Sequence, residues 1–128
     1  VKVVLYASSD ALDTDWTAKL VDVHPDGQAY NLCEGIQRAR FRVPDATPTL
    51  IEPGKIYRYE IDLWATSNAF LPGHQIRVQI SSSNFPCFDR NPNTGHSFGF
   101  DIEMRQANQT IYHDEEHPSH IVLPVIPR

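Results

Sequence analysis

Residues 16–27 read WTAKLVDVHPDG, and this stretch decides the fold class of the chain. Apolar and polar side chains alternate from Trp16 to Leu20, which places Trp16 on the core face of a β-strand. The run continues to Val23 and then reaches Asp26-Gly27, a pair that supplies the positive φ of a tight hairpin. The stretch therefore predicts a strand that turns back into an antiparallel neighbour.

The same period of two recurs along the rest of the chain, with proline and glycine between the runs. We expect Gly35 to end the third strand and residues 84–95 to form a long loop. The expected strands cover residues 1–7, 16–23, 29–33, 37–43, 57–63, 76–81, 109–112 and 121–125. This pattern predicts an all-β fold, an antiparallel sandwich or barrel.

Length and composition limit the possible functions. The 128 residues suit one domain, and the net charge of -5 argues against a nucleic-acid-binding surface. No apolar run approaches the ~20 residues of a membrane-spanning helix, so we expect no membrane partner. The two cysteines, Cys33 and Cys87, allow at most one disulfide, and we expect two partly buried free thiols. The cellular compartment stays undecided.

Two short motifs resemble catalytic or metal-binding signatures. Residues 95–99, GHSFG, match the G-x-S-x-G of a nucleophile elbow, which needs a strand before the serine and a helix after it. Neither flank has that pattern, so we expect Ser97 to lie in a loop. Residues 113–117, HDEEH, match H-x-x-E-H, which binds zinc only on a helix. Pro118 follows directly, so we expect a polar turn, with adventitious metal capture by His113, His117 and His120 as the alternative.

Charged residues form an acidic loop and a basic row. The acidic loop holds Asp10, Asp13 and Asp15, which predict loop capping by Asx-type hydrogen bonds or a calcium site completed by other loops. The basic row alternates along one expected strand and consists of Arg38, Arg40 and Arg42. This row predicts cross-strand ion pairs with the row Arg58, Glu60 and Asp62; docking to another protein surface and a small anionic ligand remain open.

Four aromatic residues could stack on sugar rings, as in β-sandwich lectins: Trp16, Trp64, Phe85 and Phe88. Parity places Trp16 in the core and Trp64 on the polar side of its strand, so core or interface packing is the expected role.

An ordered series of short motifs over nearly the whole chain resembles one protein family. The matching segments are Ser8-Ser9-Asp10, residues 13–16 (DTDW), 18–23 (AKLVDV) and 25–27 (PDG), Gly35-Ile36, residues 38–42, Pro53-Gly54, residues 70–74 (FLPGH), 76–78 (IRV) and 81–83 (SSS), Phe85-Pro86, Phe88, Arg90-Asn91, residues 93–95 (NTG), Gln109-Thr110, His113-Asp114, Pro118-Ser119 and residues 123–125 (LPV). Together they resemble the C-terminal non-catalytic domain of the X-Pro dipeptidyl-peptidase and cocaine-esterase-like serine hydrolases.

The resemblance implies a jelly-roll β-sandwich of the galactose-binding-like type. In this family an α/β-hydrolase domain with a helical cap holds the Ser-His-Asp triad, and no triad position maps onto this sequence. We therefore expect no catalytic residue, cofactor or metal in the chain, and a catalytic domain of the same protein as its partner. The expected interdomain or subunit contacts are Asp13, Asp15, Trp16, Arg38, Arg40, Arg42, Arg90 and Asn93.

The resemblance also implies that the family's module begins before Val1. Residues 1–128 are then expected to form a single jelly-roll domain that corresponds to the last half to two-thirds of the family's module. An unpaired strand edge in such a module predicts pairing with a second copy, hence a homo-oligomer. The alternative function is a stand-alone β-sandwich that binds carbohydrate or calcium.

Overall fold

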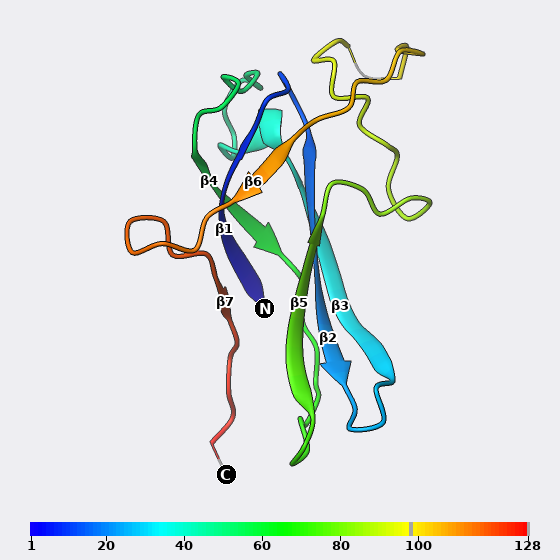
Figure 1. Cartoon of the computed structure of the whole chain (residues 1–128), viewed down its shortest axis with the longest axis vertical. Coiled ribbons are helices and arrows are strands. Elements are labelled where there is room, and N and C mark those ends of the chain that lie inside the picture. The colour runs from blue at the N-terminus through cyan, green and yellow to red at the C-terminus, as the bar shows by residue number, and fades with distance from the viewer. Residues whose placement is uncertain (98, 128) are drawn as a thin grey trace.

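The computed structural model describes residues 1–97 and 99–127, and it is a sandwich of two antiparallel β-sheets (Figure 1). The strands are β1 (Lys2–Ser9), β2 (Asp15–Val23), β3 (Ala29–Arg38), β4 (Tyr57–Asp62), β5 (Gln75–Ser81), β6 (Gln109–Ile111) and β7 (His120–Val122), and a short 3₁₀ helix, η1 (Ala39–Phe41), follows β3. The all-β antiparallel sandwich predicted from the sequence is confirmed.

Each sheet is built around one central strand. In the first sheet β1 pairs with β4 along one edge, and β6 and β7 pair with its other edge at opposite ends. In the second sheet β2 lies between β3 and β5, with a β-bulge at Leu20/Val21. The predicted hairpin joins β2 to β3 at Asp26-Gly27, where Gly27 has a φ of 87°.

The core lies between the sheets and is dominated by large side chains from β1, β2 and β4. Its fully buried members include Leu5, Trp16, Leu20, Tyr59 and Ile61. The Trp16 and Tyr59 rings pack with their centroids 5.7 Å apart. Parity therefore placed Trp16 correctly, and a buried indole cannot stack on a sugar.

Two expectations for the segment after Cys33 are wrong, and the last strand, expected over 121–125, is β7 at His120–Val122. Gly35 does not end the third strand, because β3 continues through it to Arg38. The missing side chain serves a close approach instead: a Cβ on Gly35 would overlap the backbone carbonyl of Asp62 at the end of β4. The strand expected over 37–43 is also absent, because the chain turns at η1, where the Ala39 amide donates to the Thr14 carbonyl at 2.9 Å.

Long loops fill one end of the sandwich. The segment between β5 and β6 contains no strand or helix over 82–97 and 99–108, which extends the loop expected over 84–95. β5 lies at the edge of its sheet, and its second side pairs with no described strand. Within the described part of the chain there is no helix with the length and apolar character that a membrane crossing requires.

Candidate functional site

A buried ion-pair cluster ties three loops together at the end of the sandwich where β2 begins. Asp13 is fully buried, and its carboxylate accepts hydrogen bonds from Arg40 Nε at 2.7 Å and from the Arg40 amide at 3.0 Å. Asp15, also buried, accepts from Arg38 Nε at 2.7 Å and Nη2 at 2.9 Å. Asn91 Nδ2 bridges the two carboxylates at 3.0 Å from each. The cluster thus fixes the loop after β1, η1 and the loop after β5 relative to one another.

This cluster corrects the predicted partners of the basic row. Arg38 and Arg40 do not lie on one strand face, because Arg38 ends β3 and Arg40 lies in η1. Their carboxylate partners come from the acidic loop, whereas Arg58 pairs with Glu60 on its own strand at 2.7 Å. The two charged motifs are therefore two halves of one network.

The same contacts argue against a calcium site in the acidic loop. Asp10 accepts from the Asn108 amide at 2.9 Å and from Asn108 Nδ2 at 2.7 Å. The hydrogen bonds from the Asn108 side chain and amide lower the pKa of Asp10. Every carboxylate oxygen of Asp10, Asp13 and Asp15 already accepts a hydrogen bond from the protein, so the three side chains do not converge on a shared cation.

The remaining expected contact residues brace the loops around this cluster. Arg42 donates to the Thr49 carbonyl at 2.7 Å, and its guanidinium lies 4.5 Å from the centroid of the Tyr57 ring. Arg90 lies 4.5 Å from the centroid of the Phe85 ring. Asn93, at a φ of 64°, donates from Nδ2 to the Arg105 carbonyl at 2.9 Å. A role of these residues at an interface stays a prediction.

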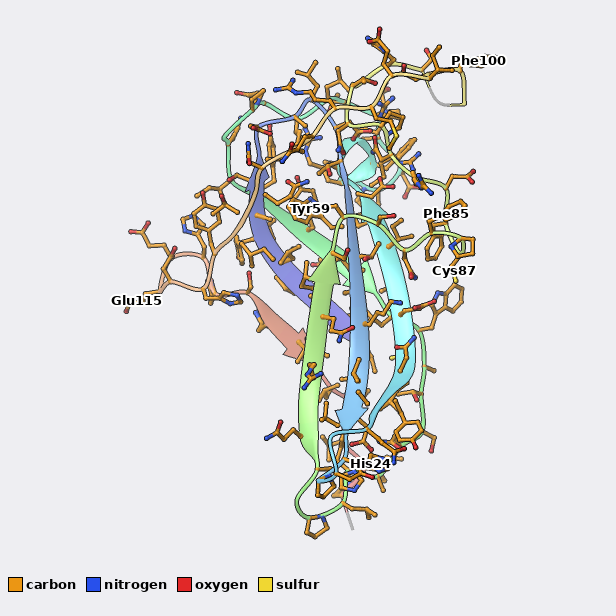
Figure 2. The ribbon with its side chains drawn as sticks, turned by 45° about the vertical axis from the view of Figure 1, so that its right-hand side comes forward. His24, Tyr59, Phe85, Cys87, Phe100 and Glu115 are labelled. Atoms are coloured by element: carbon orange, nitrogen blue, oxygen red, sulfur yellow. The ribbon has the colours of Figure 1, made fainter. Side chains whose placement is uncertain are left out.

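An apolar segment missed by the sequence reasoning projects from the same end of the molecule. Phe100, Ile102 and Met104 are 89%, 97% and 66% exposed on the loop between β5 and β6. Figure 2 shows Phe100 at the end of the sandwich opposite His24. The loop is braced on both sides, because the Arg105 amide donates to the Pro92 carbonyl at 2.9 Å and Arg105 Nη2 donates to the Asp10 carbonyl at 3.1 Å. The available signal was the alternation of apolar residues within an otherwise polar loop, and such exposed apolar groups mark interaction sites.

The G-x-S-x-G match does not form a nucleophile elbow. Ser97 lies in the loop after β5, with no strand before it and no helix after it among the described residues; Phe98 lies outside them. His96 Nδ1 lies 3.0 Å from the Asp101 carboxylate, and Thr94 also donates to that carboxylate. The hydrogen bond from Thr94, followed by those from the Glu103 amide and His96, lowers the pKa of Asp101. None of the hydrogen bonds of the described residues joins Ser97 to a histidine.

The H-x-x-E-H match forms a turn between β6 and β7, as expected from Pro118. His117 Nδ1 lies 3.0 Å from Asp114, and its ring packs at 5.6 Å from that of Tyr6. His120 Nδ1 is 2.7 Å from the Pro118 carbonyl oxygen. The described histidines of this turn therefore do not group into a metal site.

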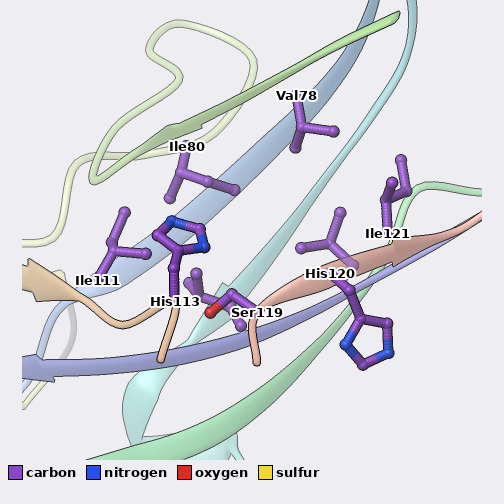
Figure 3. A pocket seen from close by; sticks show the side chains of 9 residues that line it. Val78, Ile80, Ile111, His113, Ser119, His120 and Ile121 are labelled. Carbon is purple, nitrogen blue, oxygen red and sulfur yellow. The ribbon is translucent and has the colours of Figure 1, made fainter. Parts of the chain in front are cut away.

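A cleft opens between the two sheets beside this turn (Figure 3). Its volume is about 460 Å³, and its walls come from β1, β5, β6, β7 and the turn. The lining residues are Val3, Leu5, Val78, Ile80, Ile111, His113, Ser119, His120 and Ile121. The side chains are mainly apolar, and the polar members of the lining are His113, Ser119 and His120.

The cysteines are both free, as expected, but the expected partial burial holds only for Cys33 and is wrong for Cys87. Cys33 packs against the core, where burial raises the pKa of its thiol, whereas Cys87 is exposed in the loop after β5.

Comparison with known families assigns this domain. Residues 1–122 match the model of the X-Pro dipeptidyl-peptidase C-terminal non-catalytic domain. The chain belongs to this family. The resemblance inferred from the short motifs is therefore confirmed. The family's own description calls this domain non-catalytic.

Relatives of this C-terminal domain are much longer enzymes. The chain is 59% identical over 126 residues to cocaine esterase from Rhodococcus sp. (strain MB1 Bresler), covering 97% of the chain and 22% of that protein. It is 31% identical over 145 residues to a putative serine esterase from Mycobacterium bovis, covering 98% and 21%. The chain thus spans about a fifth of the length of the curated relatives it matches.

Solved structures agree with the sandwich. An aminopeptidase from a marine sediment Thaumarchaeota archaeon superposes with a TM-score of 0.87 at 36% identity, covering 92% of this chain and 21% of that one. A selenomethionine-labelled α-amino acid ester hydrolase superposes with a TM-score of 0.85 at 32% identity, with the same coverages.

Proposed function

We propose that this chain is the accessory β-sandwich of a serine hydrolase acting on acyl compounds (esters, amides or X-Pro peptides), and that it packs against the catalytic and cap domains of that protein. The proposal extends to one jelly-roll domain over residues 1–128, without catalytic residues of its own. Family membership and the hydrolase names of the relatives support this class of parent protein.

The observation that carries the packing role is the exposed apolar loop. Phe100 and Ile102 are almost fully exposed, and burying such a side chain contributes about 1.5–3 kcal/mol. A loop that displays three large apolar side chains while its base is hydrogen-bonded to Asp10, in the loop after β1, is preorganised to dock on another surface. The ion-pair cluster beneath it keeps the loop base in position, so Asp13, Asp15, Arg38 and Arg40 act through positioning.

The geometry of the described residues offers Ser97 no hydrogen-bonded general base. Acyl transfer by serine needs a nucleophile, a general base within hydrogen-bond reach and an oxyanion hole. Among the described residues no hydrogen bond joins Ser97 to a general base. The neighbouring His96 has its Nδ1 atom 3.0 Å from the Asp101 carboxylate.

The test has two arms. The chain alone is assayed with a p-nitrophenyl ester, with and without a serine-directed phosphonate; the expected result is no phosphonate-sensitive turnover. In the second arm the matching region of the Rhodococcus cocaine esterase is replaced by this chain, and the chimera is expected to hydrolyse the ester. Turnover by the chain alone that disappears in Ser97→Ala would overturn the accessory role, and an inactive, unfolded chimera would count against the packing.

A further inference from the structure

One buried carboxylate at the other end of the sandwich lacks a permanent cation. Asp22 is only 4% exposed, comparable with Asp13 and Asp15, each of which pairs with an arginine. Among the described residues the ion-pair partners of Asp22 are two histidines, His24 and His74, which carry charge only when protonated. A buried carboxylate without a fixed positive partner is costly, so this position favours a cation.

The three side chains converge because of the sheet register. Val23 pairs with Gln75 at the ends of β2 and β5, so His24 and His74 flank the last paired residues of neighbouring strands. His74 Nδ1 lies 2.9 Å from Asp22 Oδ1, and His24 Nε2 lies 3.8 Å from Asp22 Oδ2. The two imidazole rings contact each other with centroids 4.2 Å apart and planes tilted by 42°. Figure 2 places His24 at the end of the sandwich opposite Phe100.

We propose that Asp22, His24 and His74 bind a divalent transition-metal ion, with Zn²⁺ as the favoured ion. One ligand atom from each side chain lies within 4.8 Å of the other two. A tetrahedral ion with bonds of about 2.0–2.1 Å holds its ligands about 3.3 Å apart. His74 Nδ1 lies 2.9 Å from Asp22 Oδ1 and His24 Nε2 lies 3.8 Å from Asp22 Oδ2, so one imidazole lies beside each oxygen of the carboxylate. Two imidazoles and one carboxylate suit Zn²⁺, Co²⁺ or Ni²⁺ better than Ca²⁺ or Mg²⁺.

The three side chains differ in burial and in the contacts that hold them. Asp22 is held by Asn68 Nδ2 at 3.4 Å as well as by His74, whose side chain is mostly buried. The His24 side chain is 36% exposed in the hairpin turn and rests 4.7 Å from the Tyr30 ring centroid. His24 is therefore the most accessible of the three ligands, and its exposed side leaves the fourth position to water. Binding would fasten the β2–β3 turn to the turn before β5.

The test is Zn²⁺ titration of the metal-stripped chain by calorimetry, with Ca²⁺ and Mg²⁺ titrated in parallel. The test variant is His24→Phe, which removes one ligand but keeps an aromatic ring against Tyr30. The control is His117→Phe, which changes the rival histidine-rich turn. Circular dichroism and thermal unfolding in a chelator establish that both variants fold.

The expected result is one saturable Zn²⁺ per chain, with affinity lowered about tenfold or more in His24→Phe and unchanged in His117→Phe. Zn²⁺ should also raise the Tm of the parent chain and of the control but not of His24→Phe. Absence of saturable binding, equal affinity in His24→Phe, or loss of binding in His117→Phe would each overturn the proposal. Because Co²⁺ in such a site absorbs visible light, the Co²⁺ spectrum of the parent chain checks coordination without any variant.

Discussion

Replacing Asp13 with alanine is expected to destabilise the chain strongly, although no catalytic or ligand role is assigned to Asp13. The carboxylate is fully buried and accepts three hydrogen bonds, two from Arg40 and one from Asn91. Breaking a buried ion pair by removing one partner costs about 3–5 kcal/mol, because the other charge is left uncompensated. Arg40 keeps a hydrogen bond to the His96 carbonyl at 3.0 Å, so we expect the lower end, about 3 kcal/mol.

The assay is urea unfolding monitored by tryptophan fluorescence, because Trp16 is buried beside the cluster. Urea is uncharged, so it does not screen the ion pairs as an ionic denaturant would. In a parallel thermal melt of Asp13→Ala, the Tm should fall by roughly 10 °C for a domain of this size. The control is Glu60→Ala, which removes an ion pair with Arg58 that is about half exposed and should cost less than about 1 kcal/mol. Equal losses in the two variants, or strict additivity of Asp13→Ala and Arg40→Ala, would refute the reasoning.

Three further predictions concern the sheets. Gly35→Ala should destabilise the chain by about 1–3 kcal/mol in urea unfolding, because the new Cβ meets the Asp62 carbonyl; a loss below about 0.5 kcal/mol would contradict the close packing of β3 on β4. Burial, opposed in part by the Trp16 indole, raises the pKa of Tyr59 to about 12, so the folded state retains a proton that the unfolded state loses near pH 10. Stability from this group is therefore complete below pH 10 and declines between pH 10 and 12, and Tyr59→Phe should flatten that decline in pH-dependent melts. Finally, the open edge of β5 should pair two copies at high concentration, and Ile76→Lys should restore the monomer in light scattering; a monomeric parent chain would count against edge pairing.

The strands were predictable because their side chains alternate across a sheet with one buried face. The boundaries failed where backbone contacts between distant segments decide the conformation. Gly35 is a typical strand breaker in isolation, yet here its missing Cβ admits the Asp62 carbonyl. The alternation around Arg40 resembles a strand, but the hydrogen bond from the Ala39 amide to Thr14 turns the chain into η1.

The candidate site was predictable in its residues but not in their pairing. Both charged motifs were recognised, yet the arginines were assigned to the wrong carboxylates, because spacing along the chain does not reveal which loops meet. Asn91, which joins the two ion pairs, was noted only as part of the Arg90-Asn91 match to the family, and nothing in its position along the chain indicated that it meets Asp13 and Asp15. The exposed apolar loop was missed because Phe100 and Ile102 belong to no regular element, and burial patterns are informative only within helices and strands.

The most direct test of the packing role compares one triple substitution in two settings: Phe100→Ser, Ile102→Ser and Met104→Ser, in the free chain and in the cocaine esterase chimera. Because these side chains are largely exposed in the free chain, its Tm should not change, whereas the Tm of the chimera should fall as the apolar contacts are lost. Leu71→Ser, an exposed apolar position in the turn before β5, is the matched control and should alter neither protein. A chimera whose Tm and ester hydrolysis are unaffected by the triple substitution would contradict the proposal that this loop docks the sandwich onto the catalytic domains.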